Sequence, residues 1–349
     1  MIPVVTPLSP AAGLRPVARG DDGRGIFLSI CVPTYNRAEW LARCFDQLAE
    51  MVAKSEFRNR LEVVVSDNHS TDDTPAVVTA ALEALSALCP VRAYTQPVNV
   101  GAEPNFKFLY DVARGEYVWL CADDDELSGD EFEQMLHDLV EYRPEVCMST
   151  FTNPSSTQNQ IHLAGGAAVE MVTDLEAALL RFYRHTMVTQ YVLRKRELTP
   201  EEMAISEKAS HQIVWFCAAA MLLFSRYEQR LLLRSGELAR DTRVDAKIRV
   251  SPSVFGLIRD SVLTGLGDHP ERARFERLLP VITPETYLVG HLLRTSLGDR
   301  IADMEIALED YKYLRANLRR VAFSSLRNFV KVPVVLALFP VTYWLSRRR

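Results

Sequence analysis

Four consecutive acidic residues, Asp123-Asp124-Asp125-Glu126, form the part of the sequence best suited to chemistry. The run follows an apolar segment directly, and its carboxylates would repel one another unless a cation neutralised them. Carboxylate oxygens are hard ligands that suit Mg²⁺ or Mn²⁺, and such a cation could bridge the acids and a diphosphate. The alternative is an acidic turn that only caps the following helix.

The acidic run closes the last of four apolar, β-branched segments that begin roughly 30 residues apart, the length of a βαβ unit. Segments with helical periodicity lie between them and after Ser128, at 39–57, 74–88 and 105–112. This alternation predicts an α/β fold with a mostly parallel sheet and helices on both faces. Ligands of such sheets bind beyond the carboxyl ends of the strands. The four predicted strands are Ile26–Pro33, Leu61–Ser66, Val91–Gln96 and Tyr117–Ala122.

The turn after the first predicted strand, Pro33-Thr34-Tyr35-Asn36-Arg37, contains no glycine. A dinucleotide site would need GxGxxG at this place, and a P-loop would need GxxxxGK[ST]. The turn therefore argues against NAD, FAD and P-loop nucleotide sites. It offers polar side chains and an aromatic ring at a position where ligands bind.

The turns after the second and third strands add further polar groups. Asp67 ends the second strand, where its carboxylate could accept hydrogen bonds from a nucleobase N–H or a ribose hydroxyl. A local Asx turn is the alternative for this residue. Ser70 is predicted to cap the next helix, with Asp73 as its capping-box partner. In the third turn, Gly101 is predicted to adopt a backbone angle that suits glycine, and Asn105 could cap a short helix.

Taken together, these motifs resemble family 2 glycosyltransferases of the GT-A fold over roughly residues 26–135. The acidic triplet with Glu126-Leu127 is most similar to the abequosyltransferase-like branch, bacterial enzymes that build O-antigen or related surface polysaccharides. The resemblance implies a Rossmann-like GT-A domain followed by a mainly helical C-terminal region. The segments that carry it are 32–37, 64–72, 99–105 and 115–125.

The resemblance also implies roles for single residues. Asp67 would hold the base, Asp123 and Asp124 would contact the ribose and the sugar-phosphate, and Asp125 would be the main metal ligand, with Asp123 beside it. The cofactor would be Mn²⁺ or Mg²⁺. The reaction would transfer a sugar from a nucleotide-sugar to an acceptor hydroxyl with inversion at the anomeric carbon. The other residues expected to bind the nucleotide-sugar are Pro33, Thr34, Tyr35, Arg37, Asn68, Asn99, Gly101 and Asn105.

An inverting reaction needs a general base within about 3 Å of the acceptor hydroxyl. Many family members carry an acidic pair for this purpose at the start of a helix in the second half, and this sequence departs from that pattern. Its candidates are Glu207 and His211, just before the apolar segment Ile213–Phe224. A carboxylate is the conventional choice, and a histidine titrates near neutral pH. A surface or helix-capping role is the alternative for both residues.

The composition limits the remaining possibilities. The 349 residues are 48% hydrophobic and 24% charged, which excludes wholesale disorder and collagen-like or disulfide-scaffold classes. Six cysteines without a CxxC pair predict buried, reduced thiols of a cytosolic protein. The net charge of −5 indicates no nucleic-acid partner, and no particular oligomeric state is indicated.

The charge is distributed unevenly along the chain. Residues 311–349 contain nine basic residues and no acid, so this tail carries +9 and the rest of the chain −14. Within the tail, 332–345 is uncharged, too short to cross a bilayer but suited to insertion at its interface between basic flanks. We therefore expect the tail to contact a membrane surface, although a basic helix packed on the catalytic domain is the alternative.

These interpretations define an expected organisation. Residues 1–25 would be a flexible leader and 26–230 the GT-A domain, with a nucleotide-sugar half (26–135) and an acceptor half (136–230). Residues 231–349 would be a helical C-terminal region, with Ser206–Arg230 a long helix before it and further helices at 253–266, 270–279, 286–297 and 299–318. Members of the family branch act on polyprenyl diphosphate-linked glycans, which would place the protein at the cytoplasmic face of the inner membrane.

Two other functions stay open at this point. The first is a non-catalytic nucleotide-sugar-binding or membrane scaffold protein of the same fold, against which the intact acidic triplet argues. The second is a sugar nucleotidyltransferase, which would normally carry a glycine-rich and basic loop after the first strand. This sequence has neither feature in that turn.

Overall fold

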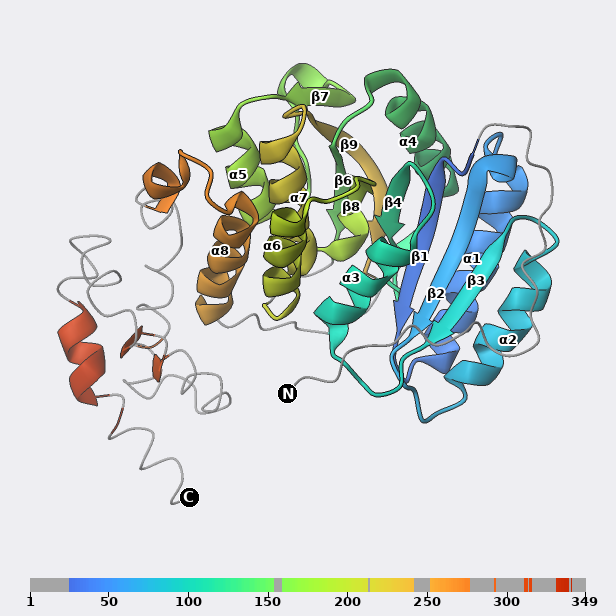
Figure 1. Ribbon diagram of the computed structural model, residues 1–349, viewed down its shortest axis with the longest axis horizontal. Helices are drawn as coiled ribbons and strands as arrows, with labels where there is room; N and C mark the ends of the chain where they lie inside the picture. The colour runs from blue at the N-terminus through green and yellow to red at the C-terminus, as the bar shows by residue number, and fades with distance from the viewer. Residues whose placement is uncertain are drawn as a thin grey trace. The chain divides into compact units, whose positions relative to one another are not determined.

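The computed structural model describes residues 25–153, 159–212, 214–241 and 252–276, together with Leu292 and short stretches between 311 and 340. The chain divides into two compact units, Met1–Ala246 and Lys247–Arg349. The first unit holds a nine-stranded sheet with helices around it (Figure 1). The expected leader and most of the basic tail lie outside the described residues.

Strand order in the sheet is β3-β2-β1-β4-β8-β6-β9-β5, and β7 pairs with β9. The strands β3, β2, β1 and β4 are parallel, whereas β8 runs antiparallel to both β4 and β6. β9 is parallel to β6 and antiparallel to β5 and β7. The strands are β1 (Leu28–Thr34), β2 (Leu61–Asp67), β3 (Val91–Thr95), β4 (Tyr117–Leu120), β5 (Glu126–Leu127), β6 (Val146–Thr152), β7 (Val169–Val172), β8 (Tyr191–Arg194) and β9 (Leu231–Arg240).

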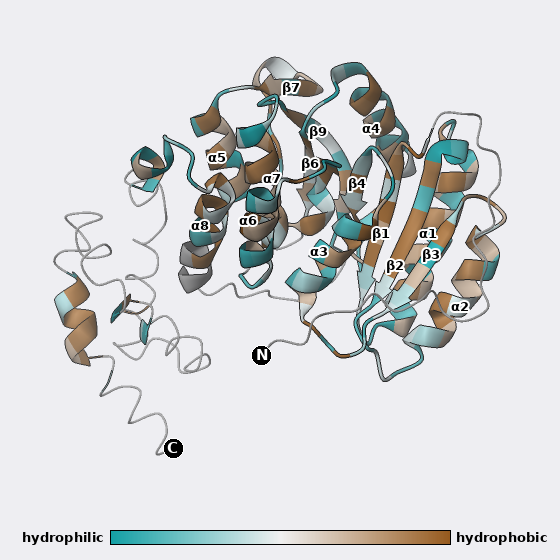
Figure 2. Cartoon of the chain, viewed as in Figure 1, coloured by the Kyte–Doolittle hydropathy of each residue, from teal (hydrophilic) through white to brown (hydrophobic). Residues whose placement is uncertain are grey.

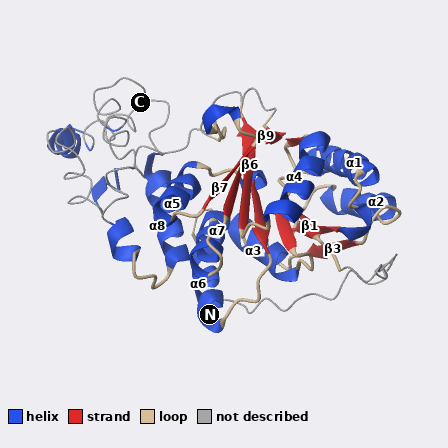
Figure 3. Ribbon diagram, turned by 90° about the horizontal axis from the view of Figure 1, so that it is seen from above, coloured by secondary structure: helices blue, strands red, loops and turns tan. Residues whose placement is uncertain are grey.

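Helices cover both faces of this sheet, so the predicted α/β class is confirmed. Figure 3 shows α1, α2 and α4 on one face and α3 on the other. The helices of the first unit are α1 (Ala38–Lys54), α2 (Thr74–Leu85), α3 (Ala102–Val112), α4 (Gly129–Tyr142), α5 (Leu175–Arg184), α6 (Pro200–Ser210) and α7 (Trp215–Arg226), with short 3₁₀ turns η1 (Arg58–Arg60), η2 (Ala164–Gly166) and η3 (Val188–Gln190). The second unit contains α8 (Pro252–Leu266).

The main core lies between the parallel strands and the helices α1 and α4. β1 and β2 are buried along their whole length, as expected for strands covered on both faces. Figure 2 shows the hydrophobic colour over much of both strands and a more hydrophilic colour at their carboxyl ends. One stripe of α1, including Leu41, Phe45 and Leu48, packs into this core, as its 3.6-residue periodicity predicts. All six cysteines are buried.

Two expectations about the second half are wrong. The segment expected as one helix over Ser206–Arg230 forms α6 and α7, and the chain turns between them at Val214, which has a left-handed backbone (φ 57°, ψ 54°). The region from residue 231 does not begin with helices, because β9 is a strand of the central sheet. The expected boundary at residue 230 therefore falls inside the first unit, which extends to Ala246.

The strand β9 is hard to recognise because charged groups are buried in it. Arg234 is almost fully buried, and its guanidinium pairs with Asp138 (2.6 Å) and Glu131 (3.1 Å) of α4. Gly236 leaves room for the same Glu131 carboxylate, which a Cβ atom would overlap. A strand with an inward arginine and a glycine lacks the alternating pattern on which a sequence prediction depends.

Of the four helices predicted after residue 250, one is confirmed, one is confirmed in part, and two lie almost entirely outside the described residues. The helix expected at 253–266 is confirmed by α8, and residues 272–276 of the segment 270–279 are helical. The segments 286–297 and 299–318 lie almost entirely outside the described residues. Among the helices that the structure describes, none has the length and apolar character needed to span a membrane.

Candidate active site

The parallel register of β3, β2, β1 and β4 brings the turns that follow them to one edge of the sheet. A cavity of about 370 Å³ lies at this edge. Nine of the eleven residues expected to bind the nucleotide-sugar line it, and the other two, Asp67 and Asp124, do not. The nine are Pro33, Thr34, Tyr35, Arg37, Asn68, Asn99, Gly101, Asn105 and Asp123.

Arg37 connects the first turn to the acidic run. Its guanidinium lies 2.9 Å from Asp123 and 2.5 Å from Asp124, and its side chain is 42% exposed. The backbone N–H of Arg37 donates to the Thr74 hydroxyl (3.0 Å), which fixes the start of α1 against α2. The positive charge of Arg37 therefore relieves part of the repulsion that the sequence predicts within the acidic run.

Asp123 is buried, and burial raises the pKa of its carboxyl, although the nearby Arg37 charge opposes the shift. Its Oδ1 atom takes the Arg37 contact. Its Oδ2 atom is buried and has no hydrogen-bond partner among the described residues. A buried carboxylate oxygen without a partner is costly, and a bound ligand is one of the few things that would satisfy it.

Asp125 is held differently, by groups that sequence reasoning did not single out. The Thr189 hydroxyl donates to Asp125 Oδ2 (2.5 Å). Gln47 of α1 donates to the Asp125 carbonyl oxygen (3.2 Å) and accepts from the N–H of Leu127 (2.8 Å). A second cavity of about 330 Å³ lies here and shares Asp123 with the first. It is lined by Trp40, Arg43, Asp46, Gln47, Asp123, Asp124, Asp125 and Glu126.

This donor set fits a divalent cation. Three carboxylates of the acidic run are buried at the second cavity, and one of their oxygens, Asp123 Oδ2, has no partner within the described part of the chain. Hard oxygen ligands of this kind suit Mg²⁺ or Mn²⁺. Asp123 and Asp125 are the residues that could hold such a cation.

Asp67 ends β2, and one of its two oxygens makes the local turn that the sequence offered as the alternative. Its Oδ1 atom accepts from the N–H of Ser70 (3.0 Å), which is the local turn. Its Oδ2 atom is buried and has no partner among the described residues. The predicted capping box is wrong, because the Ser70 hydroxyl accepts from Asn36 N (2.8 Å) and the Asp73 side chain makes no cap at the start of α2.

Asn68 organises the turn after β3. Its side chain donates to Asn99 Oδ1 (2.9 Å) and to the Gly101 carbonyl (3.2 Å), and accepts from Val100 N (2.9 Å). Gly101 has φ +90°, which confirms the predicted need for glycine. The expected cap at Asn105 is wrong, because α3 begins at Ala102 and Asn105 is buried within it.

The two candidate bases lie apart from both cavities. Glu207 and His211 are at the C-terminal end of α6, with side chains 59% and 52% exposed and 3.4 Å from each other. Glu207 also lies 3.3 Å from Lys107 of α3. Neither residue lines the cavity at the strand ends, although α3, which contacts Glu207, lines it with Ala102 and Phe106.

Sequence reasoning missed several residues around these cavities. Val188, Phe106 and Ala122 line the first cavity, Gln47 lines the second, and Thr189 contacts Asp125. Val188 and Thr189 belong to η3, which directly precedes β8 in the chain and lies outside the motif segments. The pairing of β8 with β4 brings η3 to the site. No local signal marks either residue.

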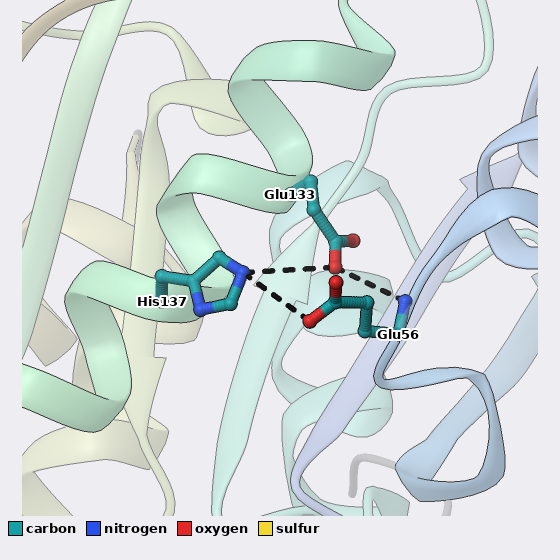
Figure 4. A group of neighbouring side chains, drawn as sticks. All are labelled: Glu56, Glu133 and His137. Carbon is teal, nitrogen blue, oxygen red and sulfur yellow. Dashed lines mark hydrogen bonds and ion pairs between the residues drawn. The ribbon is translucent and has the colours of Figure 1, made fainter.

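A separate group of possible metal ligands comprises Glu56, Glu133 and His137 (Figure 4). The His137 Nε2 atom lies 3.8 Å from Glu56 and 3.9 Å from Glu133. Glu56 follows the C-terminal end of α1, and this helix of 17 residues is about 25 Å long. The group is largely exposed and joins α1 to α4 at the end of α1 opposite to Arg37.

Comparisons with known proteins show the family and the fold of this chain. The family model described as glycosyl transferase family 2 matches residues 29–202, about half of the chain. Abequosyltransferase RfbV of Salmonella typhimurium is 30% identical over 105 residues, which are 30% of this chain and only 30% of that relative. Glycosyltransferase GlyG of Streptococcus pneumoniae is 22% identical over 267 residues, covering 72% of this chain and 86% of the relative.

The fold is also that of a solved structure. TarS of S. aureus, crystallised in complex with UDP-GlcNAc, superposes with a TM-score of 0.60 at 18% identity, covering 93% of this chain and 92% of the other. At this identity the likeness concerns the fold.

Proposed function

The chain belongs to glycosyl transferase family 2, and from this premise we propose that it transfers a sugar from a nucleotide-sugar donor to a hydroxyl of a glycan acceptor in bacterial surface polysaccharide synthesis. The observation that carries the proposal is the cavity at the strand ends, where residues from four separate turns meet next to the buried acids. The relative RfbV, an abequosyltransferase, supports the choice of pathway.

In the proposed reaction the donor occupies this cavity. Asp67 does not line the cavity itself but adjoins Asn68, which does, and its buried Oδ2 atom, without a partner among the described residues, would receive a nucleobase N–H. Arg37 presents a half-exposed guanidinium beside Asp123 and Asp124, so it can contact a diphosphate without leaving the site. Tyr35 offers an exposed aromatic face at the cavity wall.

A divalent cation, Mn²⁺ or Mg²⁺, would be held by Asp125 and Asp123 and would stabilise the charge of the leaving diphosphate. The acceptor hydroxyl would attack from the opposite side of the sugar and invert the anomeric carbon. We propose Glu207 or His211 as the base for its proton. The contact of Glu207 with Lys107 of α3 supports this choice, since the first turn of that helix lines the donor cavity.

The acceptor in this proposal is a polyprenyl diphosphate-linked glycan at the cytoplasmic face of the inner membrane. The basic tail supports it, with +9 over residues 311–349. A chain truncated after Tyr311 should lose binding to anionic liposomes in sedimentation, and undiminished binding would refute the membrane role of the tail.

The donor site can be tested without knowledge of the acceptor. We expect one of the UDP-, GDP-, CDP- and dTDP-sugars to raise the melting temperature in the presence of Mn²⁺, since a ligand of the folded state stabilises by RT ln(1 + [L]/Kd). Asp125→Ala should abolish the shift, whereas Asp130→Asn, an exposed acid of α4 next to the run, should keep it. The absence of a shift with all four donors would refute the proposal.

The product distinguishes the enzyme classes. A glycosyltransferase releases a nucleoside diphosphate from the nucleotide-sugar in a manner that depends on Asp125. A sugar nucleotidyltransferase would instead exchange pyrophosphate into a nucleoside triphosphate, and a scaffold protein would bind the donor and release nothing.

A further inference from the structure

Thr189 lies next to residues that line each of the two cavities, although it lines neither itself. Its neighbour Val188 lines the first cavity, and its hydroxyl contacts Asp125, which lines the second. The residue is 1% exposed. Its backbone is fixed as well, because the indole N–H of the fully buried Trp119 in β4 donates to the Thr189 carbonyl (2.9 Å).

The direction of the Thr189 hydroxyl proton follows from its two contacts. The backbone N–H of Ala122 donates to Thr189 Oγ1 (3.0 Å), so the hydroxyl is the acceptor in that contact. The same oxygen lies 2.5 Å from Asp125 Oδ2. A hydroxyl has a single proton, and a separation of this size is typical of an O–H donating to a carboxylate. Thr189 therefore donates its only proton to Asp125.

We infer that Thr189 is a positioning residue that orients the Asp125 carboxylate for the divalent cation. The inference rests on the proposed function, and in particular on Asp125 as a cation ligand. The terminal torsion of an aspartate is broad, so an unrestrained carboxylate samples many orientations. The buried Thr189 hydroxyl is itself held by two hydrogen bonds. Because it fixes the Oδ2 atom of Asp125, it also fixes the direction of the Oδ1 atom. Groups that orient ligating carboxylates in this way affect metal affinity strongly.

Two substitutions separate the hydroxyl from the shape of the side chain. Thr189→Val keeps the volume and the β-branch but removes the donor, whereas Thr189→Ser keeps the donor. Thr150→Val is the matched control, because Thr150 is a buried threonine whose hydroxyl accepts from the Ile161 backbone N–H (3.0 Å). It reports on the general effect of removing a buried hydroxyl.

The experiment titrates Mn²⁺ alone into the full-length proteins, and free Mn²⁺ is measured by electron paramagnetic resonance. We expect Thr189→Val to weaken Mn²⁺ binding by about 10- to 100-fold. Thr189→Ser and Thr150→Val should stay within about 3-fold of the wild type. Melting curves of all four proteins show whether a loss of affinity follows a loss of folded structure.

The outcomes distinguish this inference from the proposed function. If the wild type binds Mn²⁺ and Thr189→Val binds it equally well, the positioning role is refuted while the cation site stands. If Thr150→Val loses as much affinity as Thr189→Val, the effect comes from general destabilisation and the inference is also refuted. If the wild type binds no Mn²⁺, the cation itself is removed from the proposed function, and the role of Thr189 falls with it.

Discussion

Glu103, in the first turn of α3, joins the donor cavity to α7 and should make stability depend on pH. Its two carboxylate oxygens accept from the backbone N–H groups of Val214 (3.0 Å) and Trp215 (2.6 Å), which begin α7. The neighbouring residue Ala102 lines the donor cavity. A left-handed β-branched residue such as Val214 is strained, so this carboxylate holds a backbone conformation that would not form by itself.

Burial raises the pKa of Glu103 from its ordinary value of 4.5 to about 7, although the two backbone hydrogen bonds lower it. The neutral form is therefore favoured in the folded chain at pH values below about 7. As the pH rises from about 4.5 to 7, the unfolded chain releases this proton while the folded chain retains it, so stability falls across that window. Linkage gives a loss of at most about 0.8 kcal/mol at pH 5 and about 3.3 kcal/mol at pH 8.

Glu103→Gln removes this dependence, because the amide does not titrate. It also replaces one acceptor by a donor, which costs about 1–3 kcal/mol at every pH. The free energy of unfolding of the variant minus that of the wild type should therefore rise by up to about 2.5 kcal/mol between pH 5 and pH 8. Urea unfolding at both pH values, followed by tryptophan fluorescence, measures this difference.

A difference that is the same at pH 5 and pH 8 would refute the reasoning. Asp174→Asn provides the control, because Asp174 caps α5 at the surface by accepting from Ala177 N (2.8 Å). Its unfolding free energy should differ from that of the wild type by no more than about 0.5 kcal/mol at either pH.

Three further predictions concern the fold and the donor site. Asp67→Asn should still accept from Ser70 N but would present an N–H where the wild type has the Oδ2 atom, which lacks a partner among the described residues. The nucleotide-sugar thermal shift should therefore vanish while the melting temperature of the ligand-free protein stays unchanged, and a retained shift would contradict the role of Asp67. Asn68→Ala removes three hydrogen bonds to the turn at Gly101 and should cost about 1–3 kcal/mol in urea unfolding. Burial lowers the pKa of His185 to about 4, so the wild type should lose stability as the pH falls from about 6.5 to 4, and His185→Gln should lose less over the same range; identical acid unfolding profiles would refute this.

The first half of the fold could be predicted because its signals are local. Each parallel strand is a short apolar run followed at once by its own turn residues, so one stretch of sequence specifies both the element and its place at the ligand edge. Nine predicted donor residues meet in one cavity for this reason. The rule that ligands bind beyond the carboxyl ends of parallel strands can be applied without knowing which distant residues pack against them.

The second half could not be predicted because its determinants are distant in sequence. Glu145 is fully buried and pairs with Arg194, the last residue of β8, and with Arg196, two residues further on. The break between α6 and α7 depends on Glu103, about 110 residues earlier in the chain. Thr189 reaches Asp125 across 64 residues. In each case the residues look like ordinary surface positions until the partner is known.

The place of β9 has a consequence for how the protein is made. β9 pairs with β5, which begins at Glu126, the last acid of the run, and the Ser128 N–H donates to the Leu238 carbonyl (3.0 Å). Ribosomal synthesis therefore delivers the acids more than a hundred residues before the strand that pairs beside them. A chain released after residue 202, where the family match ends, would leave β5, β6 and β7 without this neighbour. We therefore expect a fragment that ends before Arg240, the last residue of β9, to lack part of the sheet beside the acidic run.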